Sequence, residues 1–74
     1  MKFAELERTL DVLDDAAQIR FLNRNLVKLR GKDLGAGLLS LANLYALQGR
    51  FRLAAEFYEK AGFHEEARKA RARS

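Results

Sequence analysis

The sequence predicts an all-α fold of about five short antiparallel helices, and three observations support this prediction. Apolar residues make up 49% of the 74-residue chain, a proportion typical of a protein that folds around a core. Most of these apolar residues are leucine and alanine, and β-branched residues are few, which favours helix over strand. Proline is absent, so glycines and acidic pairs must mark the ends of the helices.

The length of the chain limits it to a single helical domain, residues 1–74. A chain of this size buries only roughly 60% of the surface that its unfolded form exposes, so its core is small. There is no cysteine, and therefore no disulfide or thiolate metal site can stabilise the fold. We expect its stability to come from well-packed helices, from self-association or from a partner.

Residues 1–32 are expected to form an N-terminal pair of helices. The first, roughly residues 2–13, shows the helical spacing of apolar residues at Phe3, Leu6, Leu10 and Leu13. Asp15, with Gln18 three residues later, indicates the capped start of a second helix over roughly residues 15–30. Gly31 is expected to end this helix with a left-handed backbone conformation. One long bent helix is the alternative interpretation of this segment.

Residues 33–61 are expected to form a helical hairpin. Asp33 can cap a helix over about residues 34–48, whose apolar residues occupy more than one face. A helix of this kind is buried on several sides, so we expect it to be the central one. Gly49 provides the turn, and residues 51–61 form the second helix of the hairpin.

Residues 62–74 are expected to form a C-terminal capping helix with a basic tail. Glu65 and Glu66 fall in its first turn and basic residues in its last turn, an order that complements the helix dipole. The spacing of Gly49, Phe51 and Ala54 recurs 13 residues later at Gly62, His64 and Ala67. This recurrence suggests that the last helix stacks on its neighbour in the same sense as the hairpin.

Residues 38–61 resemble a tetratricopeptide repeat, a pair of antiparallel helices with small and large residues at fixed places. The segment reads LLSLANLYALQGRFRLAAEFYEKA, and nine positions match: Leu38, Leu41, Ala42, Tyr45, Gly49, Phe51, Ala54, Tyr58 and Ala61. Ala42 and Ala54 are small where the two helices are expected to cross. The residues expected to fill the space around the crossing are Leu41, Tyr45, Phe51 and Tyr58. The family's terminal proline is missing, and Glu66 stands in its place.

The resemblance implies that the chain is a right-handed superhelical fragment. The first half does not match the repeat pattern, so it is either a strongly diverged hairpin or an unrelated pair of helices. Repeats of this kind are stacked interfaces, and three or more usually give stability. One repeat with flanking helices falls short of that number. The chain therefore either pairs with itself or is a piece of a larger array, and an excised or designed solenoid piece without a ligand is a third possibility.

The function that the resemblance implies is that of a protein–protein interaction or scaffold module. Ligands of the family lie on the concave face lined by the first helix of each hairpin. In this chain the corresponding residues are Ala36, Leu39, Asn43, Ala46 and Leu47. Such an apolar face suits an amphipathic helix or peptide, or a second copy of the chain. The alternative is that the leucines belong to the core and that Asn43 is exposed or bonds a neighbouring loop.

Nucleic-acid binding is the rival interpretation, because the net charge is +4. The candidate basic patch consists of Arg20, Arg24, Lys28, Arg68, Lys69 and Arg71. The first three residues share one helix face at i, i+4 and i+8. Acidic residues are interspersed and no aromatic residue lies within a basic run to stack on bases, so a solvated charged surface is the simpler explanation.

The chain offers little for catalysis. Cysteine is absent, His64 is the one histidine, and neither Ser40 nor Ser74 has a histidine–acid pair in its sequence context. We therefore expect no enzymatic activity, no metal and no cofactor. No apolar run approaches the ~20 residues that a membrane crossing needs, and the N-terminus does not resemble a signal peptide. A cytoplasmic location without membrane association is the resulting expectation.

Overall fold

The computed structural model describes all 74 residues, and they form an all-helical fold. The elements follow in the order α1 (Phe3–Leu10), α2 (Asp15–Asn25), the short 3₁₀ helix η1 (Leu26–Lys28), α3 (Gly31–Leu47), α4 (Phe51–Lys60) and α5 (His64–Arg73). No residue belongs to a strand. The prediction of an all-α fold is therefore confirmed. None of these helices combines the length and apolar character that crossing a membrane requires.

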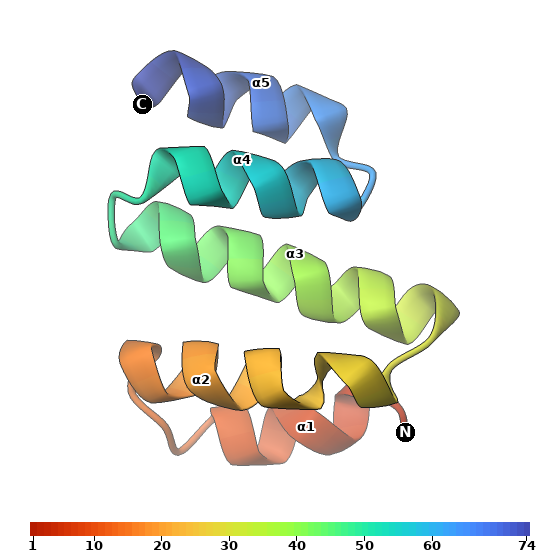
Figure 1. Cartoon of the computed structure of the whole chain (residues 1–74). Coiled ribbons are helices and arrows are strands. Elements are labelled where there is room, and N and C mark those ends of the chain that lie inside the picture. The colour runs from red at the N-terminus through yellow and green to blue at the C-terminus, as the bar shows by residue number, and fades with distance from the viewer.

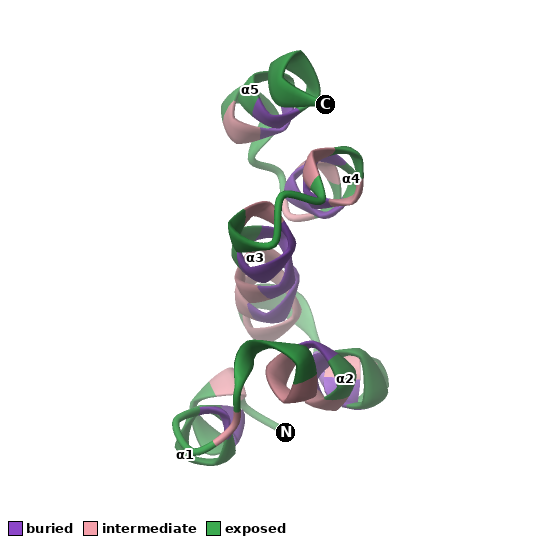
Figure 2. Cartoon of the chain, turned by 90° about the vertical axis from the view of Figure 1, so that its left-hand side faces the viewer, coloured by how far each residue is buried: buried purple, intermediate pink, exposed green.

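The helices are stacked in chain order, with α1 and α2 at one end of the molecule and α5 at the other (Figure 1). After a quarter turn the helices alternate between two layers, with α1, α3 and α5 on one side and α2 and α4 on the other (Figure 2). The Cα atoms extend over 33 × 26 × 15 Å, so the molecule is a thin slab. The central helix α3 contacts α1, α2 and α4, which explains why its apolar residues occupy several faces.

A core of 16 buried apolar side chains runs between the two layers. Leu22, Leu29 and Leu41 are its largest fully buried members. Ala42 on α3 and Ala54 on α4 are completely inaccessible to solvent, and these two helices pack against each other. A side chain this small at each position lets two helix backbones approach closely.

The start of α2 differs from the sequence-based prediction by one residue. Asp14, not Asp15, is the N-cap, and its side chain accepts a hydrogen bond of 2.8 Å from the Ala17 amide. Asp14 has the extended backbone that a capping residue needs, whereas Asp15 is already helical. Gln18 does not complete a capping box, because its amide nitrogen donates to the carbonyl oxygens of Leu10 and Leu13.

The boundary between α2 and α3 was also predicted wrongly. The helix expected to reach residue 30 ends at Asn25, and Leu29 has an extended backbone. Gly31 has the expected positive φ of 55°, but it begins α3. Asp33 lies inside the first turn of α3, and its Oδ1 atom accepts a hydrogen bond of 2.9 Å from the Phe3 amide. Asp33 therefore satisfies a free donor at the start of α1, not of α3.

The two turns around α4 repeat the same backbone geometry. Gly49 has a φ of 75° and Gly62 a φ of 86°, a conformation that favours glycine. Matching pairs of hydrogen bonds close the two turns: Gly49 N–H to Ala46 O and Arg50 N–H to Tyr45 O, then Gly62 N–H to Glu59 O and Phe63 N–H to Tyr58 O. The 13-residue recurrence in the sequence thus corresponds to a recurrence in the structure. It places α5 against α4 much as α4 lies against α3.

Candidate functional site

A groove of about 480 Å³ opens between α3 and α5. Its eight lining residues are Ala46 from α3, Phe51 and Tyr58 from α4, and Glu66, Lys69, Ala70, Ala72 and Arg73 from α5. Helices α3 and α5 lie in one layer and α4 in the other (Figure 2). We therefore call the two lining residues of α4, Phe51 and Tyr58, the floor of the groove. Five of the eight lining residues are apolar, and the volume lies in the range of known ligand sites. We refer to this feature as the α3–α5 groove.

Phe51 and Phe63 are the two aromatic residues outside the core, and of these only Phe51 lines the groove. Sequence analysis placed it in the space around the helix crossing, together with Leu41, Tyr45 and Tyr58, and these three are indeed buried. Phe51 is half-buried, and it lies outside the core cluster and outside the half-buried side chains packed against that cluster. The guanidinium carbon of Arg73 lies 5.3 Å from the centre of its ring. Since Phe51 also lines the groove, the part of its ring that Arg73 does not cover contributes apolar surface there.

Tyr58 connects the floor of the groove to α3. Its hydroxyl group donates a hydrogen bond of 2.5 Å to Oδ1 of Asn43. Burial of the side chain, and to a lesser extent the negative charge of Glu66, raises the pKa of Tyr58 above its ordinary value of 10.0. The phenol therefore stays protonated and able to donate. Because the side-chain oxygen of Asn43 accepts this bond, the bond holds α3 and α4 together beside the groove.

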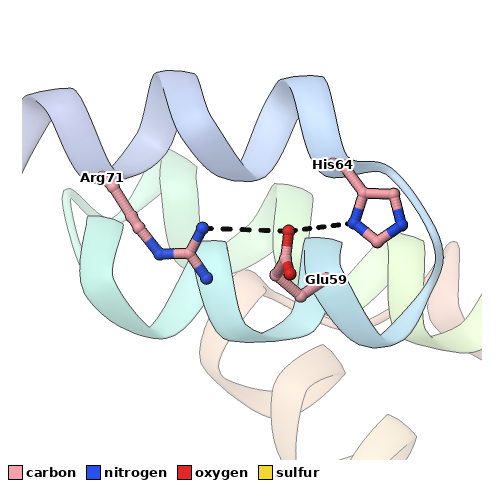
Figure 3. Close-up of polar contacts among 3 residues, drawn as sticks. All are labelled: Glu59, His64 and Arg71. Atoms are coloured by element: carbon pink, nitrogen blue, oxygen red, sulfur yellow. Dashed lines mark hydrogen bonds and ion pairs between the residues drawn. The ribbon is translucent and has the colours of Figure 1, made fainter.

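Glu59 on α4 interacts with two residues of α5, His64 and Arg71 (Figure 3). One carboxylate oxygen, Oε1, lies 3.0 Å from Nδ1 of His64 and 3.8 Å from Nη1 of Arg71. The hydrogen bond from His64, followed by the positive charges of His64 and Arg71, lowers the pKa of Glu59 despite its partial desolvation. Since His64 and Arg71 stand at opposite ends of α5, this one carboxylate helps to align the helix that forms the outer wall of the groove.

The five predicted partner-binding residues all lie on α3, but only Ala46 lines the groove. Leu39 and Ala46 are half-buried and pack against the core, and Ala36 is half-buried as well. Asn43 is exposed and bonded to Tyr58, and Leu47 is 76% exposed. Sequence reasoning missed the contributions of α4 and α5, although the 13-residue recurrence was a signal that α5 lies beside α4.

The predicted basic patch is divided between the two ends of the stack. Arg20 and Arg24 lie on α2 and Lys28 on η1, and all three are exposed. The other three cations, Arg68, Lys69 and Arg71, are exposed on α5, which Figures 1 and 2 show at the opposite end of the molecule. The six residues therefore do not form one continuous surface.

No group of three or more histidine, cysteine, aspartate or glutamate side chains is arranged to hold a metal ion. No protein-family model matches the chain, and no similar protein was found among the curated proteins or the solved structures.

Proposed function

We propose that the chain is a protein–protein interaction module that binds a helix or peptide of a partner in the α3–α5 groove. The observation that carries this proposal is the position of Phe51, an aromatic side chain outside the core that faces an apolar groove. Aromatic residues in such concave, partly desolvated positions contribute a large share of the binding energy at protein interfaces. The groove also has room for one or two apolar side chains of a partner.

The resemblance of residues 38–61 to a tetratricopeptide repeat supports the same proposal. Members of that family bind ligands on the side of the first helix of each hairpin. In this chain α3 would be the first helix of the hairpin, and α5 lies next to it in the same layer (Figure 2). On this proposal the protein acts by binding alone, without catalysis or a cofactor, and the cytoplasmic location remains a prediction from the sequence.

A second copy of the chain is the other candidate occupant of the groove. The exposed side chain of Leu47 lies next to Ala46 at the end of α3 and could extend an apolar contact. Nucleic-acid binding has weaker support, because the candidate cations are split between opposite ends of the stack. We therefore favour a peptide or helix of another protein.

Replacing Phe51 with alanine tests the proposed function. Peptide ligands are first selected from a random library of short peptides displayed on phage, with the native chain as bait. We expect Phe51→Ala to weaken binding of the tightest selected peptide by roughly tenfold or more, because it removes the central aromatic contact. Fluorescence anisotropy of the labelled peptide measures the dissociation constant.

The matched control is Phe21→Ala, which truncates another half-buried phenylalanine, one that packs against the core from α2. This control should lower the melting temperature more than Phe51→Ala does, yet leave the peptide affinity within about twofold. Equal effects of the two variants on affinity, or a failure to select any peptide, would refute the proposed function. A native dimer that Phe51→Ala dissociates would instead identify a second copy as the occupant.

A further inference from the structure

We infer that the partner peptide carries acidic residues next to its apolar anchor and that Arg50, Arg52 and Arg73 bind those residues. We call these three side chains the arginine edge. The inference rests on the proposed function, because it specifies the chemistry of the partner that occupies the α3–α5 groove. It concerns the part of the surface into which the groove continues.

A second hollow, of about 560 Å³, adjoins the groove. Its lining residues are Gly49, Arg50, Phe51, Arg52, Leu53, Glu56, Arg73 and Ser74. Phe51 and Arg73 line both the hollow and the groove. The turn between α3 and α4 lies on the same side of the molecule as the C-terminal end of α5 (Figure 1). A peptide that leaves the groove past Phe51 therefore enters the hollow.

The three guanidinium groups of the arginine edge form no ion pair within the chain. The ion pairs of the structure join Glu59 to His64 and Arg71, and Glu65 to Arg68. None of them involves the arginine edge or Lys69, the other cation that lines the groove. Glu56 is the one side-chain carboxylate that lines the hollow, and it forms no ion pair with the three arginines. Carboxylates of a partner would meet a complementary positive surface here.

Aromatic rings hold two of the three guanidinium groups in position. The guanidinium carbon of Arg50 lies 5.1 Å from the centre of the Tyr45 ring, and that of Arg73 lies 5.3 Å from the centre of the Phe51 ring. A guanidinium group stacked on a ring still has N–H donors at its edges, and a carboxylate binds such donors in the guanidinium plane. Positioning before binding reduces the conformational entropy that these arginines lose when they bind a partner.

An acidic peptide fits both the apolar groove and the arginine edge, whereas a nucleic acid fits the arginine edge alone. Binding of single-stranded nucleic acid relies on aromatic faces that are free to stack on bases. Arg73 lies over one face of the Phe51 ring, so a base cannot stack on that face, whereas an apolar side chain in the groove can still contact the rest of the ring. A peptide instead places an apolar side chain in the groove and its carboxylates on the arginine edge. The occupant that this surface fits is therefore an acidic peptide segment.

The experiment compares two triple variants that remove the same number of positive charges. Arg50→Gln with Arg52→Gln and Arg73→Gln neutralises the arginine edge, and the control combines Arg20→Gln, Arg24→Gln and Lys28→Gln at the far end of the stack. Two probes are used. One is the tightest peptide from the selection described above, and the other is the same peptide with aspartate and glutamate replaced by asparagine and glutamine.

For the native chain and the control variant, we expect the amide-substituted peptide to bind roughly tenfold more weakly than the acidic peptide, as the loss of several exposed charge pairs implies. For the arginine-edge variant the two peptides should bind almost equally. Circular dichroism verifies that both variants keep the helical content of the native chain. If the arginine-edge variant is misfolded, the single variants Arg52→Gln and Arg73→Gln are used in the same comparison.

The inference is overturned if the selected peptides contain no acidic residues, or if both triple variants weaken binding of the acidic peptide equally. In either case a strong effect of Phe51→Ala would leave the proposed function standing. A single-stranded oligonucleotide is the competing probe. Tighter binding of the oligonucleotide than of the peptide, lost in the arginine-edge variant, would also overturn the inference, in favour of a nucleic-acid ligand.

Discussion

Tyr58 shows how a single residue serves both the fold and the site. Its ring is buried between the helices and lines the groove, while its hydroxyl group donates to Asn43 on the preceding helix. A comparable bond occurs one helix earlier, where the side-chain amide of Asn23 donates to the hydroxyl oxygen of Tyr45 at 3.1 Å. These two bonds link α2 to α3 and α3 to α4.

Tyr58→Phe is expected to reduce the free energy of unfolding by about 1 kcal/mol at neutral pH, because Asn43 loses its donor. The raised pKa of Tyr58 means that its contribution is fully present below pH 10.0 and is lost as the pH rises through the folded-state value. Urea denaturation across this range should therefore show the advantage of the native chain over Tyr58→Phe shrinking above pH 10.0. A difference that stays constant with pH would contradict this assignment.

The burial of the small residues expected at the helix crossing was predicted correctly, but the burial of one large residue expected there was not. Ala42 and Ala54 are inaccessible in the structure, as their small size in a hairpin pattern suggested. Phe51 was assigned to the same crossing, but it faces the groove. Helical spacing indicates which side of a helix a residue occupies. It does not indicate whether a later helix, here α5, covers that side or leaves a hollow.

Helix α3 approaches its neighbours closely at one of its glycines, Gly37. A Cβ atom on Gly37 would lie 2.8 Å from Cδ1 of Leu29 and 3.2 Å from Cδ2 of Leu26, whereas a Cβ atom on Gly35 would meet nothing within 4 Å. Leu29 is fully buried, so it has little space into which to move. Gly37 thus lets the segment after α2 pack closely against α3.

Gly35→Ala and Gly37→Ala form a matched pair, because both replace a glycine within α3. Gly35→Ala should raise the free energy of unfolding by about 0.5–1 kcal/mol through the better helix propensity of alanine. Gly37→Ala should lower it by about 1–2 kcal/mol, because overpacking against Leu29 outweighs that gain. Chemical denaturation measures both changes, and two changes of the same sign would disprove the proposed close packing at Gly37.

The two glycine turns around α4 were predictable from local signals, whereas the role of Asp33 depends on a distant contact and was not. Gly49 and Gly62 end α3 and α4 as expected, through hydrogen bonds within a few residues of each glycine. Asp33 was expected to cap its own helix, but it bonds to the Phe3 amide 30 residues away. Local sequence patterns do not reveal a pairing over this distance, because the Asp33 carboxylate is equally able to cap α3 or to accept a hydrogen bond from α1.

At the scale of the whole molecule, the alternation of helices between two layers creates the α3–α5 groove. The groove is lined by residues of α3 and α5, which lie in one layer, and of α4, which lies in the other (Figure 2). This arrangement also explains why the predicted basic patch is divided, because α2 and α5 occupy opposite ends of the stack (Figure 1). Composition alone predicted the all-α class, but the groove requires three helices to be placed in space.

Chemical-shift mapping of the isotope-labelled chain with the tightest selected peptide tests the central claim most directly. Binding in the α3–α5 groove predicts that the largest amide shift changes occur at Ala46, Phe51, Lys69 and Arg73, while α1 and α2 stay nearly unchanged. Changes centred on α1, or on the α2 face that carries Arg20 and Arg24, would contradict the assignment of this groove as the binding site.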